Sequence, residues 1–133
     1  MTTERPTRLW VLPVPYDRPP LSLNDRGHWA KGNSHRQALR RAGALLARSK
    51  GIPRDLPHIH TRLHYTPPDN RRRDEDNIIA TAKPLWDGLV DAGVVPDDNS
   101  RYMTKYMPRI HPGAKNYDGP RLRLAVWIED NTP

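Results

Sequence analysis

The sequence predicts a small α+β domain, in which a mixed β-sheet carries helices on one face. Three observations predict this fold class. The length of 133 residues fits a single domain that spans residues 1–133. Several segments alternate apolar and polar residues, as strands do, and two others repeat apolar residues at helical spacing. The expected order of elements is β-α-β-α-β-β.

The first half of the chain is expected to contain two strands and one helix. Residues 7–14 form the first strand, which ends where the prolines begin. Ser34 and Gln37 form a capping box that predicts the start of a helix, and Gly51 predicts its end. Residues 58–66 alternate as a half-buried strand. The expected buried residues are Ala38, Leu39, Ala42, Leu45 and Leu46 in the helix, and Ile59, Leu63 and Tyr65 in the strand.

The second half is expected to contain one helix and two strands. Residues 77–92 have the pattern of an amphipathic helix, in which Pro84 is expected to produce a kink. Gly93 ends this helix. Residues 102–110 and 122–128 read as the last two strands. The apolar stripe of the helix is expected to comprise Ile78, Ile79, Ala82, Leu85, Trp86 and Leu89.

Composition and charge restrict the class of protein. The net charge is +7, which favours a polyanion such as nucleic acid, although a basic surface can also serve solubility alone. Without cysteine, disulfides and thiolate zinc sites are excluded. No apolar run approaches the roughly 20 residues that cross a bilayer, and the N-terminus lacks a signal core, so we expect a cytoplasmic protein. The small apolar fraction, 35%, is compatible with a homodimer that buries further surface.

A cluster of charged residues carries the strongest functional signal. Segment 71–77 reads RRRDEDN, and a second acidic pair, Asp97 and Asp98, follows about twenty residues later. Grouped carboxylates suit a hard cation such as Mg²⁺, and adjacent arginines suit a phosphate. Asp74 and Asp76 could instead serve as helix caps, and the later pair could belong to an ordinary turn. Taken together, the two groups favour a metal site used for phosphodiester chemistry.

Lys83 and the histidines are further candidates. Lys83 lies two helical turns after Asp76, on nearly the same face, where it could orient water or stabilise charge on a phosphate. An ion pair with Asp87 or a solvated side chain explains Lys83 equally well. His58, His60 and His64 share one strand face; imidazole suits zinc or copper, but a solvated or phosphate-facing surface is the favoured interpretation.

The motif resembles that of the RusA family of small Holliday-junction resolvases, which phages and prophages often carry. The resemblance lies in the pattern Pro-Asp-x-Arg-Arg-Arg-Asp-x-Asp-Asn of residues 68–77, then Lys83, then Asp-Gly-Leu-x-x-Ala-Gly of residues 87–93, then Asp97-Asp98. It extends more weakly to the N-terminal strand, to Ser22 and Asn24 in the loop that follows, and to the C-terminal strands.

This resemblance implies a RusA-like fold and a homodimeric, Mg²⁺-dependent endonuclease that nicks four-way DNA junctions at symmetric positions, in DNA recombination and repair. It implies that Asp74, Asp76 and Asp98 bind the metal, with Asp97 as a further ligand, and that Lys83 is the essential lysine. The family's usual spacing puts this lysine at the position of Ala80. From the residues themselves, we expect Arg71, Arg72, Arg73, Arg101 and Lys105 to contact the DNA backbone, with Arg109 as a further candidate from the later strand.

Two other functions use the same residues. A non-catalytic protein that binds branched DNA would keep the basic surface and use the acids only as caps. A phosphohydrolase acting on nucleotides would require a base pocket, and the chain has no glycine-rich phosphate loop that would support one.

Overall fold

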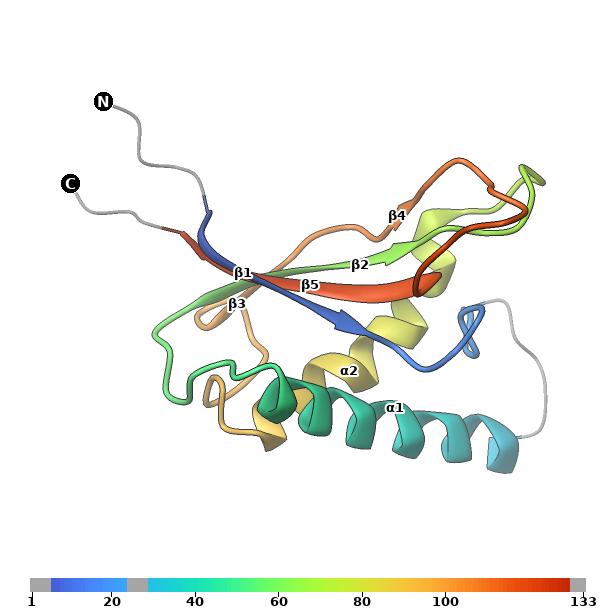
Figure 1. Cartoon of the computed structure of the whole chain (residues 1–133). Helices are drawn as coiled ribbons and strands as arrows, with labels where there is room; N and C mark the ends of the chain where they lie inside the picture. The colour runs from blue at the N-terminus through green and yellow to red at the C-terminus, as the bar shows by residue number, and fades with distance from the viewer. Residues whose placement is uncertain (1–5, 24–28, 130–133) are drawn as a thin grey trace.

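The computed structural model describes residues 6–23 and 29–129, so Asn24 lies outside the described residues. A mixed five-stranded sheet carries two helices on one face, which confirms the predicted α+β class (Figure 1). The predicted order β-α-β-α-β-β is confirmed up to the second helix, but three strands follow that helix instead of two. The elements are β1 (Pro6–Pro13), α1 (Trp29–Ser49), β2 (Ile59–Tyr65), a short 3₁₀ helix η1 (Glu75–Ile78), α2 (Ile79–Asp91), β3 (Met103–Lys105), β4 (Arg109–Ile110) and β5 (Leu122–Glu129).

The sheet has the strand order β1-β5-β2-β3, and β4 pairs with the other end of β2. β5 runs antiparallel to both β1 and β2, whereas β3 and β4 run parallel to β2. The single strand predicted for residues 102–110 is therefore wrong, because two short strands occupy that range. Pro108 lies in the interruption, where its missing N–H cannot join a sheet ladder.

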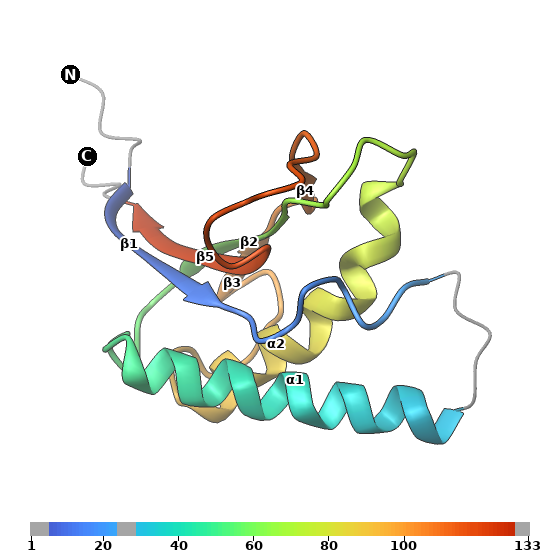
Figure 2. The same cartoon turned by 45° about the vertical axis from the view of Figure 1, so that its right-hand side comes forward.

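Helix α1 departs from its prediction in two respects. It begins at Trp29, so Ser34 lies inside the helix and the predicted capping box is wrong. The predicted buried face is also rotated: Leu39 is buried, but Leu45 is 63% exposed. The face that meets α2 contains Gly43 and other small residues, because the two helix backbones approach closely there (Figure 2).

The patterns of β2 and α2 match their predictions. Residues alternate along β2, with Ile59 and Leu63 fully buried. The predicted stripe is buried or partly buried, but its first member, Ile78, lies in η1, because α2 begins at Ile79 and continues through Pro84. The opposite face of β2, which carries His60, is only half-buried because no described helix covers it (Figure 1).

No helix within residues 6–23 and 29–129 combines the length and the apolar character that crossing a membrane requires.

Candidate active site

Asp98 lies at the centre of a charged cluster made from three segments. Its Oδ2 accepts hydrogen bonds from Lys83 Nζ at 2.6 Å and from Lys105 Nζ at 3.0 Å. Lys83 comes from the middle of α2 and Lys105 from the end of β3, while Asp98 precedes β3. Lys83 Nζ also donates to Asp87 Oδ1 at 3.0 Å. The fold thus brings three of the predicted site residues into contact, and the ion pair between Lys83 and Asp87 forms as well.

The cluster fixes the charges of its members. The hydrogen bond from Lys83 lowers the pKa of Asp98 to about 2, against the opposing effect of burial, and Lys105 adds to the shift. Burial acts to lower the pKa of Lys83, but the hydrogen bonds to Asp98 and Asp87 outweigh it, so this pKa is raised. Lys83 is therefore protonated at neutral pH and can stabilise negative charge, but it cannot act as a base in this arrangement.

Aromatic and turn contacts hold the rest of this cluster. The ammonium group of Lys105 lies 5.0 Å from the centre of the buried Trp86 ring, a distance that allows a cation–π interaction. Asp97 serves the turn: its Oδ1 accepts the backbone N–H of Asp98 at 2.7 Å, and its Oδ2 accepts from the side chain of Asn99. Arg101 is exposed, with its guanidinium 5.6 Å from the Tyr102 ring. Asp97 thus positions Asp98 through the backbone.

The arginine-rich loop is organised by Asp69, a residue that the sequence interpretation missed. Arg73 Nη2 donates to Asp69 Oδ1 at 2.8 Å, and its Nη1 donates to the carbonyl oxygens of Asp69 and Arg71. Its side chain is only 21% exposed, whereas those of Arg71 and Arg72 are 76% and 91% exposed. Arg73 therefore braces the loop, and the other two arginines face solvent. The Pro-Pro-Asp-Asn turn before the motif is the signal that could have identified Asp69.

The first acidic group lies at the start of η1. Asp74 has the backbone position of an N-cap, but its side chain forms no capping hydrogen bond and is 56% exposed. Glu75 has a structural partner, because its Oε2 accepts the backbone N–H of Ile110 at 3.0 Å and so joins η1 to β4. Asp76 is exposed in the first turn. The Asp74 carboxylate therefore does not cap the helix, and its Oδ1 lies 3.9 Å from Arg72 Nε in an exposed ion pair.

A shallow open hollow of about 560 Å³ lies beside these residues. The arginine-rich loop and Asp74 form one side of it, and Ile110, His111 and Pro112 form another. The hollow is therefore lined by cationic and acidic side chains in a place that solvent and an extended ligand can reach.

The donor chemistry of the predicted ligands fits Mg²⁺, because all are carboxylates. Their arrangement is divided: Asp74 and Asp76 lie at η1, while Asp98 is paired with two lysines. In the part of the chain that the structure describes, no three Asp, Glu or His side chains are grouped closely enough to hold a metal ion together. A cation shared by both groups would compete with Lys83 and Lys105 for Asp98.

Replacing Asp98 with Asn is expected to lower the free energy of unfolding at pH 7. The pKa of Asp98 falls from 3.8 to about 2 on folding, so its ionised form stabilises the fold above pH 4, and this contribution disappears as the pH falls from about 4 to about 2. This shift in the pKa of Asp98 corresponds to about 1–2 kcal/mol of unfolding free energy, once solvent screening at the half-exposed Lys83 is included. Urea unfolding of Asp98→Asn and of the unsubstituted protein, at several pH values between 2 and 7, measures this contribution to the unfolding free energy.

The difference between the two proteins should shrink as the pH falls through this window. Asp87→Asn is the matched control, since it removes the other carboxylate bonded to Lys83 and leaves the Asp98–Lys105 pair in place. A destabilisation that stays constant between pH 2 and pH 7 would contradict the electrostatic explanation.

No model of a known protein family matches the chain, and neither does any curated protein sequence. The RusA resemblance therefore rests on the motif itself.

Proposed function

We propose that this protein is a Mg²⁺-dependent, structure-selective DNA endonuclease of the RusA type, which resolves four-way junctions by paired symmetric nicks. The observation that carries the proposal is the contact of Lys83 with Asp98. The motif singles out both residues, although they lie 15 positions apart. Lys83 reaches an acidic residue of the motif even though it lies one helical turn beyond the family's usual lysine position. The mixed sheet with helices on one face is compatible with a RusA-like fold.

The carboxylates of Asp74, Asp76 and Asp98, with Asp97 beside them, would hold the cation, which requires that the two groups come together and that Asp98 exchange its contacts with Lys83 and Lys105 for the metal. Bound Mg²⁺ would supply an activated water and neutralise charge at the phosphate. The protonated Lys83 would stabilise negative charge that develops on the phosphate oxygens.

The exposed guanidinium groups of Arg71 and Arg72 would bind backbone phosphates in a bidentate manner. Arg73 would hold the loop in place, and Arg101 and Lys105 would add positive charge on the β3 side. We further propose a homodimer, because a two-fold symmetric pair of sites matches the symmetry of a four-way junction. Such an enzyme would act in recombination and repair in the cytoplasm of the cell that contains its DNA substrate.

One observation favours a second candidate, a branched-DNA-binding protein without catalysis. Asp98 already has two lysine partners, and the described carboxylates form no group of three. In such a protein the aspartates would serve only to position lysine and arginine side chains, and the basic surface would bind DNA.

Cleavage of a synthetic four-way junction separates the two candidates. The purified protein is incubated with an end-labelled junction, or with linear duplexes of the same arm sequences, with Mg²⁺ or with EDTA. The proposal predicts paired nicks at symmetric positions, only with Mg²⁺ and only in the junction. If the protein binds the junction tightly but makes no nicks with or without Mg²⁺, it is a binding protein without catalysis. If it cuts linear duplex as fast as the junction, it is not structure-selective.

A further inference from the structure

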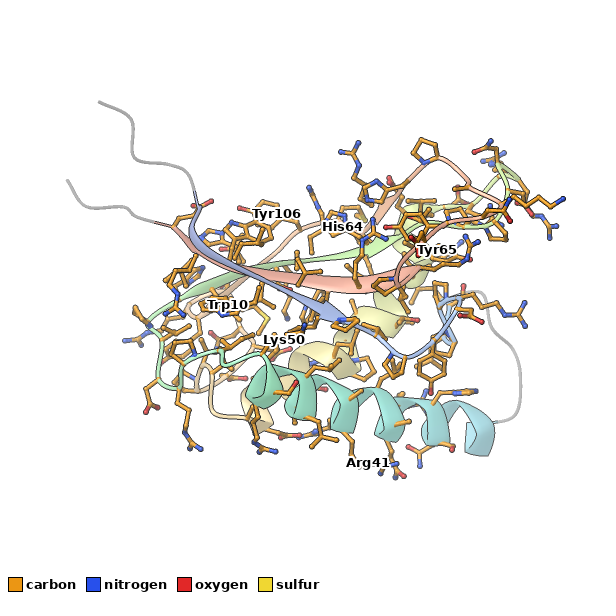
Figure 3. The ribbon with its side chains drawn as sticks, in the orientation of Figure 1. Trp10, Arg41, Lys50, His64, Tyr65 and Tyr106 are labelled. Atoms are coloured by element: carbon orange, nitrogen blue, oxygen red, sulfur yellow. The ribbon has the colours of Figure 1, made fainter. Side chains whose placement is uncertain are left out.

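The face of the sheet that lies away from the helices carries a group of cationic side chains. Figure 3 shows His64 and Tyr106 on this side, whereas Arg41 lies beyond α1 on the opposite side of the molecule. We define the sheet-face cluster as Arg62 and His64 of β2, Arg109 of β4, His111 just after β4, and Arg123 of β5. The register explains the grouping, because His64 pairs with Arg109 on one side and with Arg123 on the other.

Two histidines form the centre of the cluster. His64 Nδ1 and His111 Nε2 share a hydrogen bond of 2.9 Å, and the ring centroids are 5.1 Å apart in a stacked arrangement. One of these two facing nitrogens carries the shared proton and the other accepts it, so the hydrogen bond can form between two neutral imidazole rings. The remaining ring nitrogens can take part in other hydrogen bonds.

The arginines around the pair are positioned by uncharged groups. Arg62 Nε donates to the carbonyl oxygen of Met107 at 3.0 Å, and its guanidinium lies 5.2 Å from the Tyr106 ring. Arg123 Nη1 donates to Thr66 Oγ1 at 3.0 Å. Across residues 6–23 and 29–129, the ion pairs include none of the three arginines of the sheet-face cluster. Arg62 and Arg123 are therefore held in place, and no carboxylate in the described part of the chain forms an ion pair with any of the three arginines.

The electrostatics of His64 lead to the same conclusion. Burial lowers the pKa of His64 to about 4, and every charge that adds to this shift is positive: His111, Arg123, Arg62 and Arg109. The pKa of His111 is also lowered, by burial and then by Arg123 and Arg109. No acidic side chain opposes these effects at either histidine. Such a concentration of uncompensated positive charge attracts a polyanion.

The cluster also adjoins the candidate active site, because His111 lines the same hollow as Arg71, Arg72 and Asp74. We propose that the sheet-face cluster binds the phosphate backbone of a duplex DNA arm that leaves the candidate active site. The inference rests on the proposed function, because it takes DNA as the ligand and adds a second contact surface. Guanidinium groups fixed in orientation suit phosphate oxygens, and neutral imidazole can donate a hydrogen bond to them. A second copy of this chain placed on the cluster itself would bring like charges together.

The test replaces Arg109, whose charge no carboxylate among the described residues neutralises, and His111, whose ring contacts His64 within the cluster. The double variant Arg109→Gln/His111→Gln is compared with Arg41→Gln, which removes one positive charge from the exposed outer side of α1. Fluorescence anisotropy of a labelled linear duplex and of a labelled four-way junction, in EDTA at pH 7 and several NaCl concentrations, gives the dissociation constants. We expect binding to weaken about tenfold in the double variant, with the salt slope reduced by about 1, and little change in Arg41→Gln.

Circular dichroism and thermal melting establish that each variant is folded, and Arg109→Gln alone is the substitute if the double variant is not. If the folded variant keeps the wild-type affinity and salt slope, the inference is refuted. If its sedimentation behaviour changes as well while its DNA affinity does not, this face makes protein contacts instead. If the unsubstituted protein binds the junction but does not nick it with Mg²⁺, and the variant loses DNA affinity, the proposed nuclease is refuted and the cluster is supported. If the unsubstituted protein nicks the junction with Mg²⁺ and the variant keeps full DNA affinity, the nuclease is supported and the role of the cluster is refuted.

Discussion

Replacing Asp76 with Asn is expected to abolish Mg²⁺-dependent junction cleavage while junction binding is retained or slightly strengthened. The substitution keeps the shape of the side chain and removes one negative charge, and Asp76 is exposed in the first turn of η1, so the fold should tolerate it. Loss of an anionic metal ligand removes several kcal/mol of transition-state stabilisation, which corresponds to a rate loss of about 10³-fold or more. Single-turnover cleavage of a labelled four-way junction measures the rate, and anisotropy measures the affinity.

The neighbouring Glu75 provides a matched control. Glu75→Gln removes the same charge one residue away and retains an oxygen that can accept the N–H of Ile110. We expect this variant to cleave at close to the wild-type rate. If Asp76→Asn cleaves as fast as the unsubstituted protein, Asp76 is not a metal ligand. If both substitutions slow cleavage equally, negative charge near η1 matters, but Asp76 has no specific role.

The parts of the fold that follow a simple burial pattern could be predicted from the sequence. β2 and α2 each bury one face against the core, so Leu63 and the apolar stripe of α2 follow the expected periods. α1 differed because tertiary contact decides which of its faces is buried. Ser34 has the local pattern of a cap, yet the helix continues past it toward Trp29, and Leu45 is exposed because the close contact with α2 is made by smaller residues.

In the candidate site, too, tertiary contacts decide what the local sequence pattern does not. Segment 71–77 and Asp98 were identified from residue type and spacing, but the path of the chain between α2 and β3 decides what Asp98 contacts. Lys105 was predicted only as a DNA contact, whereas the structure pairs it with Asp98 and places it beside Trp86. Asp69 was missed because its role depends on the folded turn that brings Arg73 back to it. Contacts between distant segments require the tertiary structure, and residue spacing alone does not supply it.

Replacing Gly88 with Ala is expected to cause the largest loss of stability among Gly-to-Ala substitutions in the two helices. A Cβ at position 88 would lie 2.3 Å from the carbonyl oxygen of Arg40 and 2.8 Å from the backbone N of Ala44, both in α1. Backbone atoms cannot rotate away, so the helices must separate and loosen the core beneath them. We expect a loss of about 3 kcal/mol or more in unfolding free energy, which exceeds the gain of about 1 kcal/mol in helix propensity. Thermal melting should show a decrease of roughly 10 °C.

Gly32 in α1 is the matched control for this prediction. A Cβ there would meet only the flexible side chain of Arg36, at 3.3 Å, which can move aside. Gly32→Ala should therefore leave the melting temperature unchanged or raise it slightly, through helix propensity. Because the two substitutions are chemically identical, a difference between them measures the close approach of α1 and α2. Equal melting temperatures for both variants would show that the helices can separate at little cost, and would contradict the proposed role of Gly88 in their contact.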